Sequence, residues 1–135
     1  MANTIKLEIV TPEAKVYSED VEMVTLTGAE GEMGILPQHM PLMTLLAAGE
    51  IVARKDGKNN YLAVGDGFVQ ITGDRVAVLT DMAIGADSID EAKAEEARQR
   101  AEARLAQKLT DEEAASASAA LVHSVAQLKV KRRQR

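Results

Sequence analysis

The feature that most constrains this chain is a change of sequence pattern near Ser88. Before it, short runs rich in β-branched residues are separated by turn residues, and after it alanine-rich stretches follow a helical repeat. A chain of 135 residues with such a change suits one domain and an appendage. We therefore expect an α+β fold, with an N-terminal antiparallel β-sandwich over residues 1–87 and a C-terminal antiparallel two-helix hairpin over residues 88–135.

The first part of the chain is expected to form short antiparallel strands. Residues 4–10 alternate apolar and polar side chains, as in a half-buried strand. Two hairpin turns are indicated, at Asp56-Gly57 and at Gly73-Asp74, because glycine and aspartate tolerate the backbone of tight turns. Strands are predicted at residues 4–10, 21–27, 49–55, 61–64, 67–71 and 76–80.

The second part is expected to form two helices that contact each other weakly. Ser88 with Glu91, and Thr110 with Glu113, have the spacing of a capping box, in which each side chain pairs with a free backbone donor at a helix start. These signals predict helices over about 88–108 and 111–130. The expected seam consists mainly of small residues, which bury little apolar area, so the hairpin is interpreted as a movable element. The seam residues are Ala94, Ala97, Ala101, Leu105, Ala114, Ala117, Leu121, Ser124 and Leu128.

Charge divides the chain into an acidic body and a basic tail. Residues 1–87 carry six basic and thirteen acidic side chains, whereas residues 114–135 carry five basic side chains and no acidic one. Such a tail is typical of a segment that meets an acidic partner or folds against its own body. The chain lacks cysteine, its N-terminus does not have the pattern of a signal peptide, and its apolar runs are too short to cross a bilayer.

The glycines of the stretch Gly28–Glu50, among them Gly31 and Gly34, are expected to form structural turns and not a phosphate-binding loop. A phosphate loop would need a lysine followed by serine or threonine after the last glycine, and Gly34 is followed by a different sequence. His39 lies between two prolines on an expected rigid turn, and with His123 it is one of two histidines. We predict no metal site and no catalytic residues, because neither a ligand cluster nor a nucleophile–base arrangement is evident.

The same stretch carries a family signature. Its sequence resembles that of the epsilon subunit of F-type ATP synthase, bacterial type, in which glycines three apart precede a Leu-Pro-x-His-x-Pro-Leu run. A second stretch, residues 64–83, is similar to the second block of that family, and the resemblance extends over essentially the whole chain. The matching positions of the first block are Gly28, Gly31, Gly34, Leu36, Pro37, His39, Pro41, Leu42 and Gly49.

The resemblance implies a non-catalytic rotor subunit at the cytoplasmic face of the bacterial inner membrane, peripheral and without bilayer insertion. Its implied partners are the gamma subunit, the membrane ring of c subunits and the alpha/beta catalytic head. Glu32 would face the ring, and His39 and Pro41 would lie near gamma. The helices would restrain ATP hydrolysis by a conformational switch, with the basic tail contacting the head through Lys129, Lys131, Arg132, Arg133 and Arg135.

Some members of the family bind ATP on the folded hairpin through an Ile-Asp-x-x-Arg-Ala motif. The corresponding candidates here are Asp90 and Lys93, with Arg100 as a further basic position. Lysine cannot offer the two-pronged hydrogen bonding of arginine. An expected acidic position is Ile84, and two expected arginines are His123 and Gln127. Any ATP binding is therefore expected to be weak, and no cofactor is predicted.

An alternative function is a nucleic-acid-binding module that uses the basic tail. The acidic body and the lack of aromatic residues within the tail argue against it, because binding of single strands usually combines basic grooves with aromatic stacking. An enzyme is the third hypothesis and would need a pocket of titratable groups that the sequence does not reveal.

Overall fold

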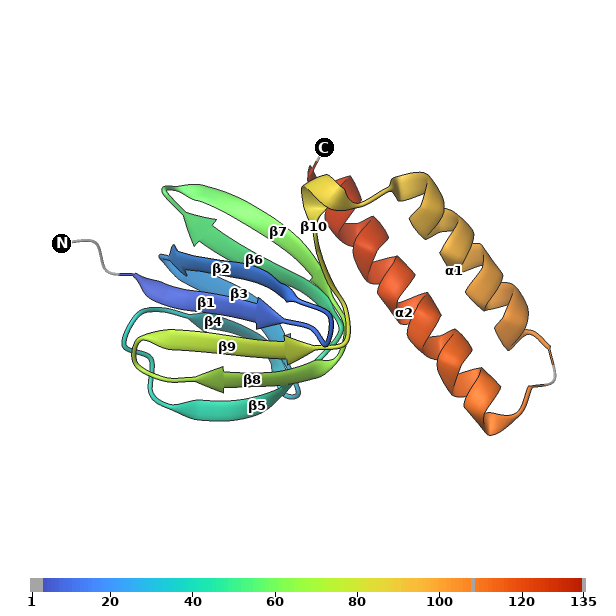
Figure 1. Cartoon of the computed structure of the whole chain (residues 1–135), viewed down its shortest axis with the longest axis horizontal. Coiled ribbons are helices and arrows are strands. Elements are labelled where there is room, and N and C mark those ends of the chain that lie inside the picture. Colours follow the sequence, from blue (N-terminus) through green and yellow to red (C-terminus); the bar gives the residue numbers. More distant parts are fainter. Residues whose placement is uncertain (1–3, 108, 135) are drawn as a thin grey trace.

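The computed structural model describes residues 4–107 and 109–134. It has ten β-strands, a short 3₁₀ helix and two α-helices in these residues, as a sandwich with a helical hairpin at one side (Figure 1). The elements are β1 (Ile5–Val10), β2 (Lys15–Val21), β3 (Met23–Gly28), β4 (Gly31–Ile35), β5 (Leu42–Leu46), β6 (Gly49–Lys55), β7 (Lys58–Val64), β8 (Gly67–Ile71), β9 (Arg75–Thr80), β10 (Ala83–Gly85), η1 (Ala86–Ser88), α1 (Glu91–Leu105) and α2 (Asp111–Gln134).

The strands form one hydrogen-bonded path that folds over on itself to give the two layers of the sandwich. The order is β10-β7-β6-β3-β5-β8-β9-β1-β2, and β4 pairs with β3. Every pair is antiparallel except β1 with β9, where Leu7 lies beside Val76 in parallel register. The expected fold class is confirmed, and the parallel pair is the difference from a purely antiparallel sheet. In the sheet order β1 lies between β9, its parallel neighbour, and β2, its antiparallel neighbour.

The sandwich core is aliphatic. Alternation along β1 buries Ile5, Leu7 and Ile9, and the other strands contribute in the same way. The remaining members of this cluster are Val21, Val24, Leu26, Ile35, Leu46, Ile51, Ala53, Leu62, Val64, Val69, Ile71, Val76 and Val78. All six predicted strands are present, but β2, β4, β5 and β10 were not predicted. Their sequences lack a clear alternation of apolar and polar residues, and their pairing partners define them as strands.

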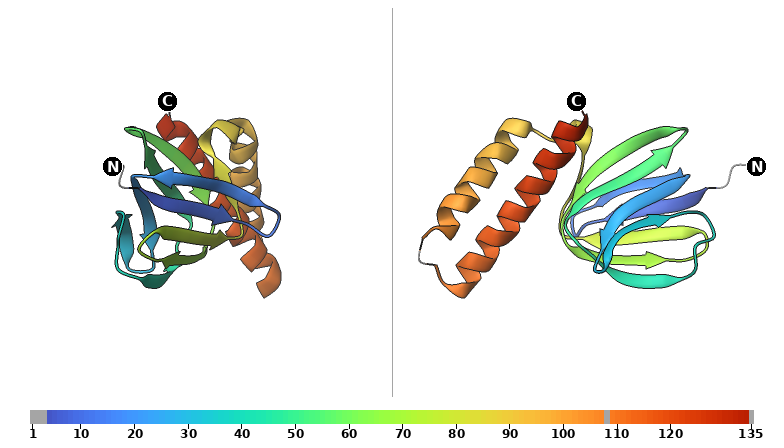
Figure 2. Two further views of the ribbon diagram at one scale, coloured as in Figure 1. Left: turned by 60° about the vertical axis from the view of Figure 1, so that its left-hand side comes forward. Right: turned by 180° about the vertical axis from the view of Figure 1, so that it is seen from behind.

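The helices form an antiparallel pair in which α2 lies between the sandwich and α1 (Figures 1 and 2). The predicted seam is largely confirmed, because Ala94, Ala101, Ala117, Ser124 and Leu128 are buried. The capping box at Thr110 is confirmed too. The Thr110 hydroxyl accepts from the Glu113 backbone N–H at 3.2 Å, and the Glu113 carboxylate accepts from the Thr110 N–H at 3.3 Å.

The other predicted capping box, at Ser88, is wrong. Ser88 ends the 3₁₀ helix, and Asp90 caps α1 by accepting from the Lys93 backbone N–H at 3.1 Å. Between them, Ile89 has extended backbone and packs with Ala86 in a small cluster beside α2. Burial of Ile89 keeps the chain extended there and delays the start of α1 to Glu91.

Candidate functional site

The glycine stretch forms a β-hairpin and then a tight turn. Gly31 begins β4 with φ of 124°, a conformation that suits glycine. Its predicted role in a turn is confirmed, since only Ala29 and Glu30 separate β3 from β4. Gly34, in contrast, lies within β4 opposite Thr25, so its expected role in a turn is wrong. The pairing of β3 with β4 makes Gly34 part of a strand. The spacing of the glycines does not indicate this pairing.

The turn predicted around His39 is present after β4. The His39 backbone N–H donates to the Leu36 carbonyl oxygen at 3.2 Å, with Pro37 second and Gln38 third at φ of 65°. This arrangement fits a type II turn, in which proline favours the second position and positive φ is needed at the third. The Gln38 N–H also donates to the Gly73 carbonyl oxygen at 2.8 Å, which ties this turn to the β8–β9 hairpin.

The three site residues predicted on this stretch are not brought together. Glu32 is exposed near the start of β4, whereas half-buried His39 and exposed Pro41 follow the other end of that strand. The His39 ring Nδ1 lies 2.7 Å from the Met40 carbonyl oxygen. Glu32 instead lines a groove of about 400 Å³ that it shares with the hairpin residues Lys129 and Arg133. The stretch therefore places the predicted residues at two separate positions on the sandwich.

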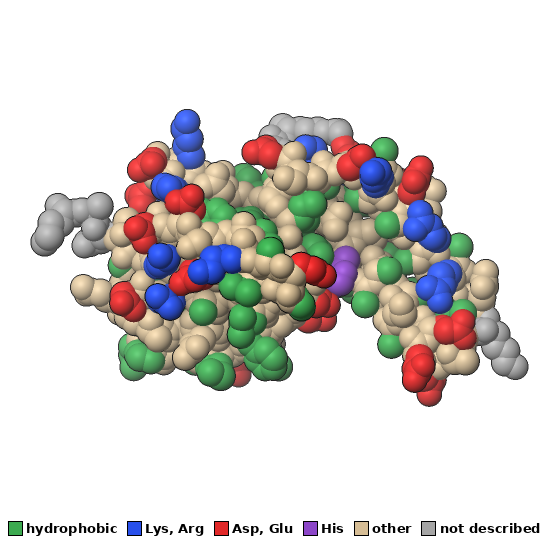
Figure 3. Space-filling model, in the orientation of Figure 1, with side chains coloured by type: hydrophobic (Ala, Val, Ile, Leu, Met, Phe, Trp, Pro, Cys, Tyr) green, Lys and Arg blue, Asp and Glu red, His purple; other side chains and the backbone are tan. Residues whose placement is uncertain are grey.

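Sequence reasoning missed a row of exposed apolar residues on the outer face of the sandwich. Leu45, Phe68 and Leu79 lie directly opposite one another on β5, β8 and β9, and more than half of each residue's surface is exposed. Met40 and Met43 are 80% and 67% exposed nearby in the chain. Hydrophobic side chains gather along the β5 and β8 side of the molecule in Figure 3. Phe68 is the only phenylalanine of the chain, and its outward position in an alternating strand was the available signal.

On the hairpin, the second helix has two contact faces. One face packs on α1, and the other places Ala126 and Val130 against Ala63 of β7 and Ala86 of η1. The cluster contains few large side chains, so its burial stabilises the docked hairpin only modestly. This second apolar face was also missed, because its residues are small and close to the basic tail.

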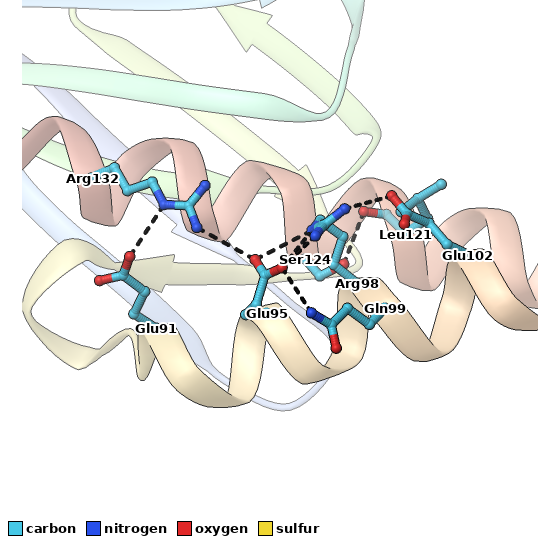
Figure 4. A network of polar contacts seen from close by, with 8 residues as sticks. All are labelled: Glu91, Glu95, Arg98, Gln99, Glu102, Leu121, Ser124 and Arg132. Carbon is cyan, nitrogen blue, oxygen red and sulfur yellow. Dashed lines mark hydrogen bonds and ion pairs between the residues drawn. The ribbon is translucent and has the colours of Figure 1, made fainter.

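The basic tail folds onto carboxylates of its own chain. Arg132 pairs with Glu91 at 3.1 Å and with Glu95 at 3.4 Å, which links the end of α2 to the start of α1 (Figure 4). Lys131 Nζ donates to the Ala86 carbonyl oxygen at 3.2 Å, and Arg133 pairs with Glu50 of β6 at 2.7 Å. Exposed Lys129 lines the groove, and Arg135 lies outside the described residues.

Glu95 is the centre of the network on α1. It pairs with Arg98 one turn on, and Arg98 also reaches Glu102 at 2.6 Å (Figure 4). The hydrogen bond from Arg98 lowers the pKa of the Glu95 carboxyl below its usual range, since it favours the charged form, while partial desolvation opposes the shift. The pKa of the Arg98 guanidinium is raised for the same reason. These charges stabilise α1 and hold the end of α2.

Of the predicted nucleotide positions, Asp90 already has a structural contact. Asp90 caps α1, and Lys93 and Arg100 are exposed on α1. At the two positions where the resemblance expects arginines, His123 Nε2 lies 3.3 Å from Asp81, and the Gln127 amide contacts the Met82 sulfur at 3.8 Å. The arrangement does not present a cluster of arginines to a triphosphate.

Neither a metal-ligand cluster nor a membrane-spanning helix is found in the described part of the chain. No group of three or more His, Cys, Asp or Glu side chains in residues 4–107 and 109–134 is arranged to hold a metal ion. In the same residues, neither α1 nor α2 has an apolar stretch long enough to span a membrane.

Comparison with known proteins gives matches along nearly the whole chain. Residues 4–86 match the model of the family "ATP synthase, Delta/Epsilon chain, beta-sandwich domain", and residues 87–132 match that of "ATP synthase, Delta/Epsilon chain, long alpha-helix domain". An ATP synthase epsilon chain of Desulforamulus reducens is 43% identical over 129 residues, covering 96% of this chain and 98% of the relative. That of Dehalococcoides mccartyi is 46% identical, with 97% and 94% covered.

The chain belongs to the delta/epsilon-chain family of ATP synthase. The resemblance inferred from the glycine stretch is thus confirmed. The two family models meet between Ala86 and Asp87, inside the 3₁₀ helix that precedes the hairpin.

Solved structures agree with this membership of the ATP synthase family. A chain of the mitochondrial ATP synthase of Euglena gracilis, in a structure that includes the c-ring, superposes with a TM-score of 0.77 at 25% identity. The superposition covers 96% of this chain and 81% of that one. A chain of the Tetrahymena thermophila enzyme, from a structure of the central stalk and c-ring, shares the fold with a TM-score of 0.60 at 12% identity, covering 96% and 95%.

Proposed function

We propose that this chain is a non-catalytic subunit of the rotating central stalk of a proton-translocating ATP synthase. The sandwich couples the gamma subunit and the ring of c subunits to the catalytic head, and the hairpin restrains ATP hydrolysis. Family membership and the likeness to chains of ATP synthase structures support this proposal. We assign the subunit to the cytoplasmic face of a bacterial inner membrane, where it would be held peripherally as part of the complex.

The observation that carries the proposal is the exposed row of Leu45, Phe68 and Leu79. The inner faces of the same strands already fill the sandwich core, so this outer row is not needed to bury apolar surface within the chain. A contiguous apolar patch on a soluble surface marks an interaction site. We assign it to the gamma subunit, with His39 and Pro41 at its edge, and Glu32 to the polar loops of the ring.

The test is co-purification of the full chain with the gamma subunit of the same organism. Phe68→Glu places a charge in the centre of the row, where its desolvation on binding is costly, and should reduce recovery of the complex at least tenfold. The matched control is Val122→Glu, which adds the same charge at an exposed valine of α2. Unchanged recovery with a folded Phe68→Glu variant would remove the row from the rotor contact.

For the hairpin, the proposed partner is an acidic segment of the catalytic head that receives the basic tail when the hairpin extends. The tail carries Lys129, Lys131, Arg132 and Arg133 within the described residues, and Arg135 beyond them. Binding of nucleic acid is the alternative that we do not favour, because the body of the chain is acidic and the tail lacks aromatic residues for base stacking.

A further inference from the structure

Glu50 is an unusual carboxylate for a surface strand. Its side chain is only 8% exposed. It belongs to β6, a strand that contacts α2. One oxygen, Oε1, accepts from Arg133 Nη1 at 2.7 Å. The other, Oε2, is fully buried and has no hydrogen-bond partner among the residues that the structure describes. A buried carboxylate is costly unless it is paired, so the ion pair with Arg133 compensates this burial.

Arg133 reaches Glu50 from the last turn of α2, 83 residues away in the sequence. Its guanidinium also lies over the ring of Tyr61 on β7, 5.4 Å from the ring centroid, which is within the range of a cation–π interaction. Both partners belong to the sandwich. Arg133 can therefore make these contacts only while the hairpin is docked.

Other contacts at this end of the hairpin include the hydrogen bond from Lys131 Nζ to the Ala86 carbonyl oxygen and an apolar cluster. The apolar cluster beside it has small members, with Ala126 and Val130 facing Ala63 and Ala86. Arg132 pairs with α1, so its contacts remain when the two helices move together. Among the described residues of the tail, Arg133 is the arginine that forms an ion pair with the sandwich.

We propose that Glu50 and Arg133 form a latch that sets the balance between the docked and the undocked hairpin. The inference rests on the proposed switching function. It identifies Glu50 as the carboxylate that an acidic partner must displace from Arg133. The guanidinium of Arg133 cannot pair with Glu50 and with a carboxylate of the head at the same time. Engagement of the tail by the head therefore requires exchange of one carboxylate for another, and undocking returns Glu50 to water.

The burial of Glu50 makes the latch asymmetric. Removing the charge of Arg133 leaves the buried carboxylate of Glu50 without a counterion in the docked state, and this strongly favours undocking. Removing the Glu50 charge leaves Arg133 about half exposed, where water solvates it, so the effect is smaller. An ordinary surface ion pair would give two small and similar effects instead.

The test uses the isolated full-length chain, which has no cysteine of its own. Spin labels on Lys58→Cys at the start of β7 and Ala119→Cys on α2, both exposed positions, report the distance between sandwich and hairpin. Pulsed electron resonance then gives the ratio of undocked to docked molecules. Arg133→Gln should raise this ratio about tenfold or more, and Glu50→Gln about two- to fivefold.

Two matched controls remove the same charges elsewhere. Lys129→Gln is in the same tail and lines the same groove, and Glu96→Gln is exposed on α1; each should change the ratio less than twofold. The double variant Glu50→Gln with Arg133→Gln should be less open than Arg133→Gln alone, because no charge is then left buried. Effects of Arg133→Gln and Lys129→Gln that are equal, or additive effects in the double variant, would overturn the latch.

Glu50→Gln keeps the proposal testable if Arg133→Gln frays the helix, since it leaves the sequence of α2 unchanged. If Glu50→Gln does not raise the ratio of undocked to docked molecules above that of Glu96→Gln, the result also counts against the latch. These measurements need no ATP synthase, so they are independent of the hydrolysis assay that tests the proposed function. If the spin labels show the latch but deletion of the hairpin leaves ATP hydrolysis unchanged, the inhibitory role is overturned. If deletion raises hydrolysis but the spin labels show no latch, only the latch is overturned.

Discussion

His123 Nε2 lies 3.3 Å from Asp81 Oδ2, and this contact joins the middle of α2 to the connection between β9 and β10. Gly65 makes the close approach possible. A Cβ atom at Gly65 would lie 2.0 Å from Asp81 Oδ1 and 2.8 Å from the His123 ring nitrogen. Because Gly65 has no side chain, His123 of the hairpin can lie close to the sandwich at this point.

Gly65→Ala is therefore expected to loosen the hairpin while the sandwich stays folded. Asp81 and His123 must move apart, and the cost should be about 1 kcal/mol, at the low end for overpacking because Asp81 is exposed. Hydrogen exchange should become faster in the half of α2 around His123. The control is Gly73→Ala, whose added Cβ meets open space. Equal exchange rates in the two variants would contradict this role of Gly65.

Gly31 and Gly34 should respond differently to alanine, although both belong to the family signature. Gly31→Ala forces a side chain into φ of 124° and should lower the free energy of unfolding by roughly 1–3 kcal/mol. Gly34→Ala brings a Cβ to 2.8 Å from the terminal methyl of Met23, which can rotate away, so its cost should be below about 1 kcal/mol. Urea denaturation of the isolated chain compares them, and a larger loss at Gly34 would reverse the argument.

The helical hairpin should lose stability in acid, with Arg98 responsible for part of the loss. Arg98 lowers the pKa of Glu95 below 4.5, so the folded chain binds fewer protons than the unfolded chain in this range. The stabilisation is present above pH 4.5 and is lost as the pH falls through the lowered pKa. Arg98→Gln should lower the melting temperature at pH 7, and its difference from the parent chain should shrink below about pH 4.5.

Arg100→Gln is the control for this pH dependence, because it removes the same charge from an exposed position on α1. Acid sensitivity from Glu8, whose pKa is lowered by hydrogen bonding to Lys15, should persist in both variants. A difference between Arg98→Gln and the parent chain that stays constant from pH 7 to pH 3 would exclude the proposed linkage.

Deleting residues 88–135 should raise the rate of ATP hydrolysis by the assembled enzyme several-fold. Assembly of the complex and coupling of the ring to the catalytic head should persist. The apolar row on β5, β8 and β9 is retained in this truncated chain. Neutralising the basic residues of the tail should give part of the activation, more clearly at low salt because exposed charges are screened at high salt. A truncated subunit that assembles without changing hydrolysis would leave only the coupling role.

Titration calorimetry of the isolated chain with ATP should give no saturable heat below millimolar concentration. Asp90 is engaged as the cap of α1, and Lys93 provides a point charge where a two-pronged arginine would be needed. The comparison is Lys93→Arg, which restores the motif and is expected to bind more tightly if the position is a true nucleotide contact. Saturable binding by the parent chain that Lys93→Ala abolishes would show that the weak-binding expectation is wrong.

Much of the fold could be predicted because its signals are local. The alternation of residues 4–10 placed β1, and the reciprocal pairing of Thr110 with Glu113 placed the start of α2. The start of α1 could not be placed in the same way. Ser88 has the right spacing, but burial of Ile89 against α2 decided that Asp90 caps the helix.

The candidate site was predicted in part. The glycine stretch indicated the family, and the charge pattern indicated a tail that meets carboxylates. The row of Leu45, Phe68 and Leu79 was not predicted, because its three members become neighbours only through the register of β5, β8 and β9. Glu32 and His39 are close in the sequence, yet β4 separates them.

The amino-acid sequence by itself determined the strands with clear alternation, the helical propensity after Ser88, the family and the charge of the tail. These properties depend on residue types at short spacing, where backbone preference and side-chain period act. Only the tertiary structure decided that β1 pairs in parallel with β9, that Phe68 faces outward among apolar neighbours, and that Glu50 is paired by Arg133. Those relationships join segments up to 83 residues apart, and the packing of the whole chain brings them together.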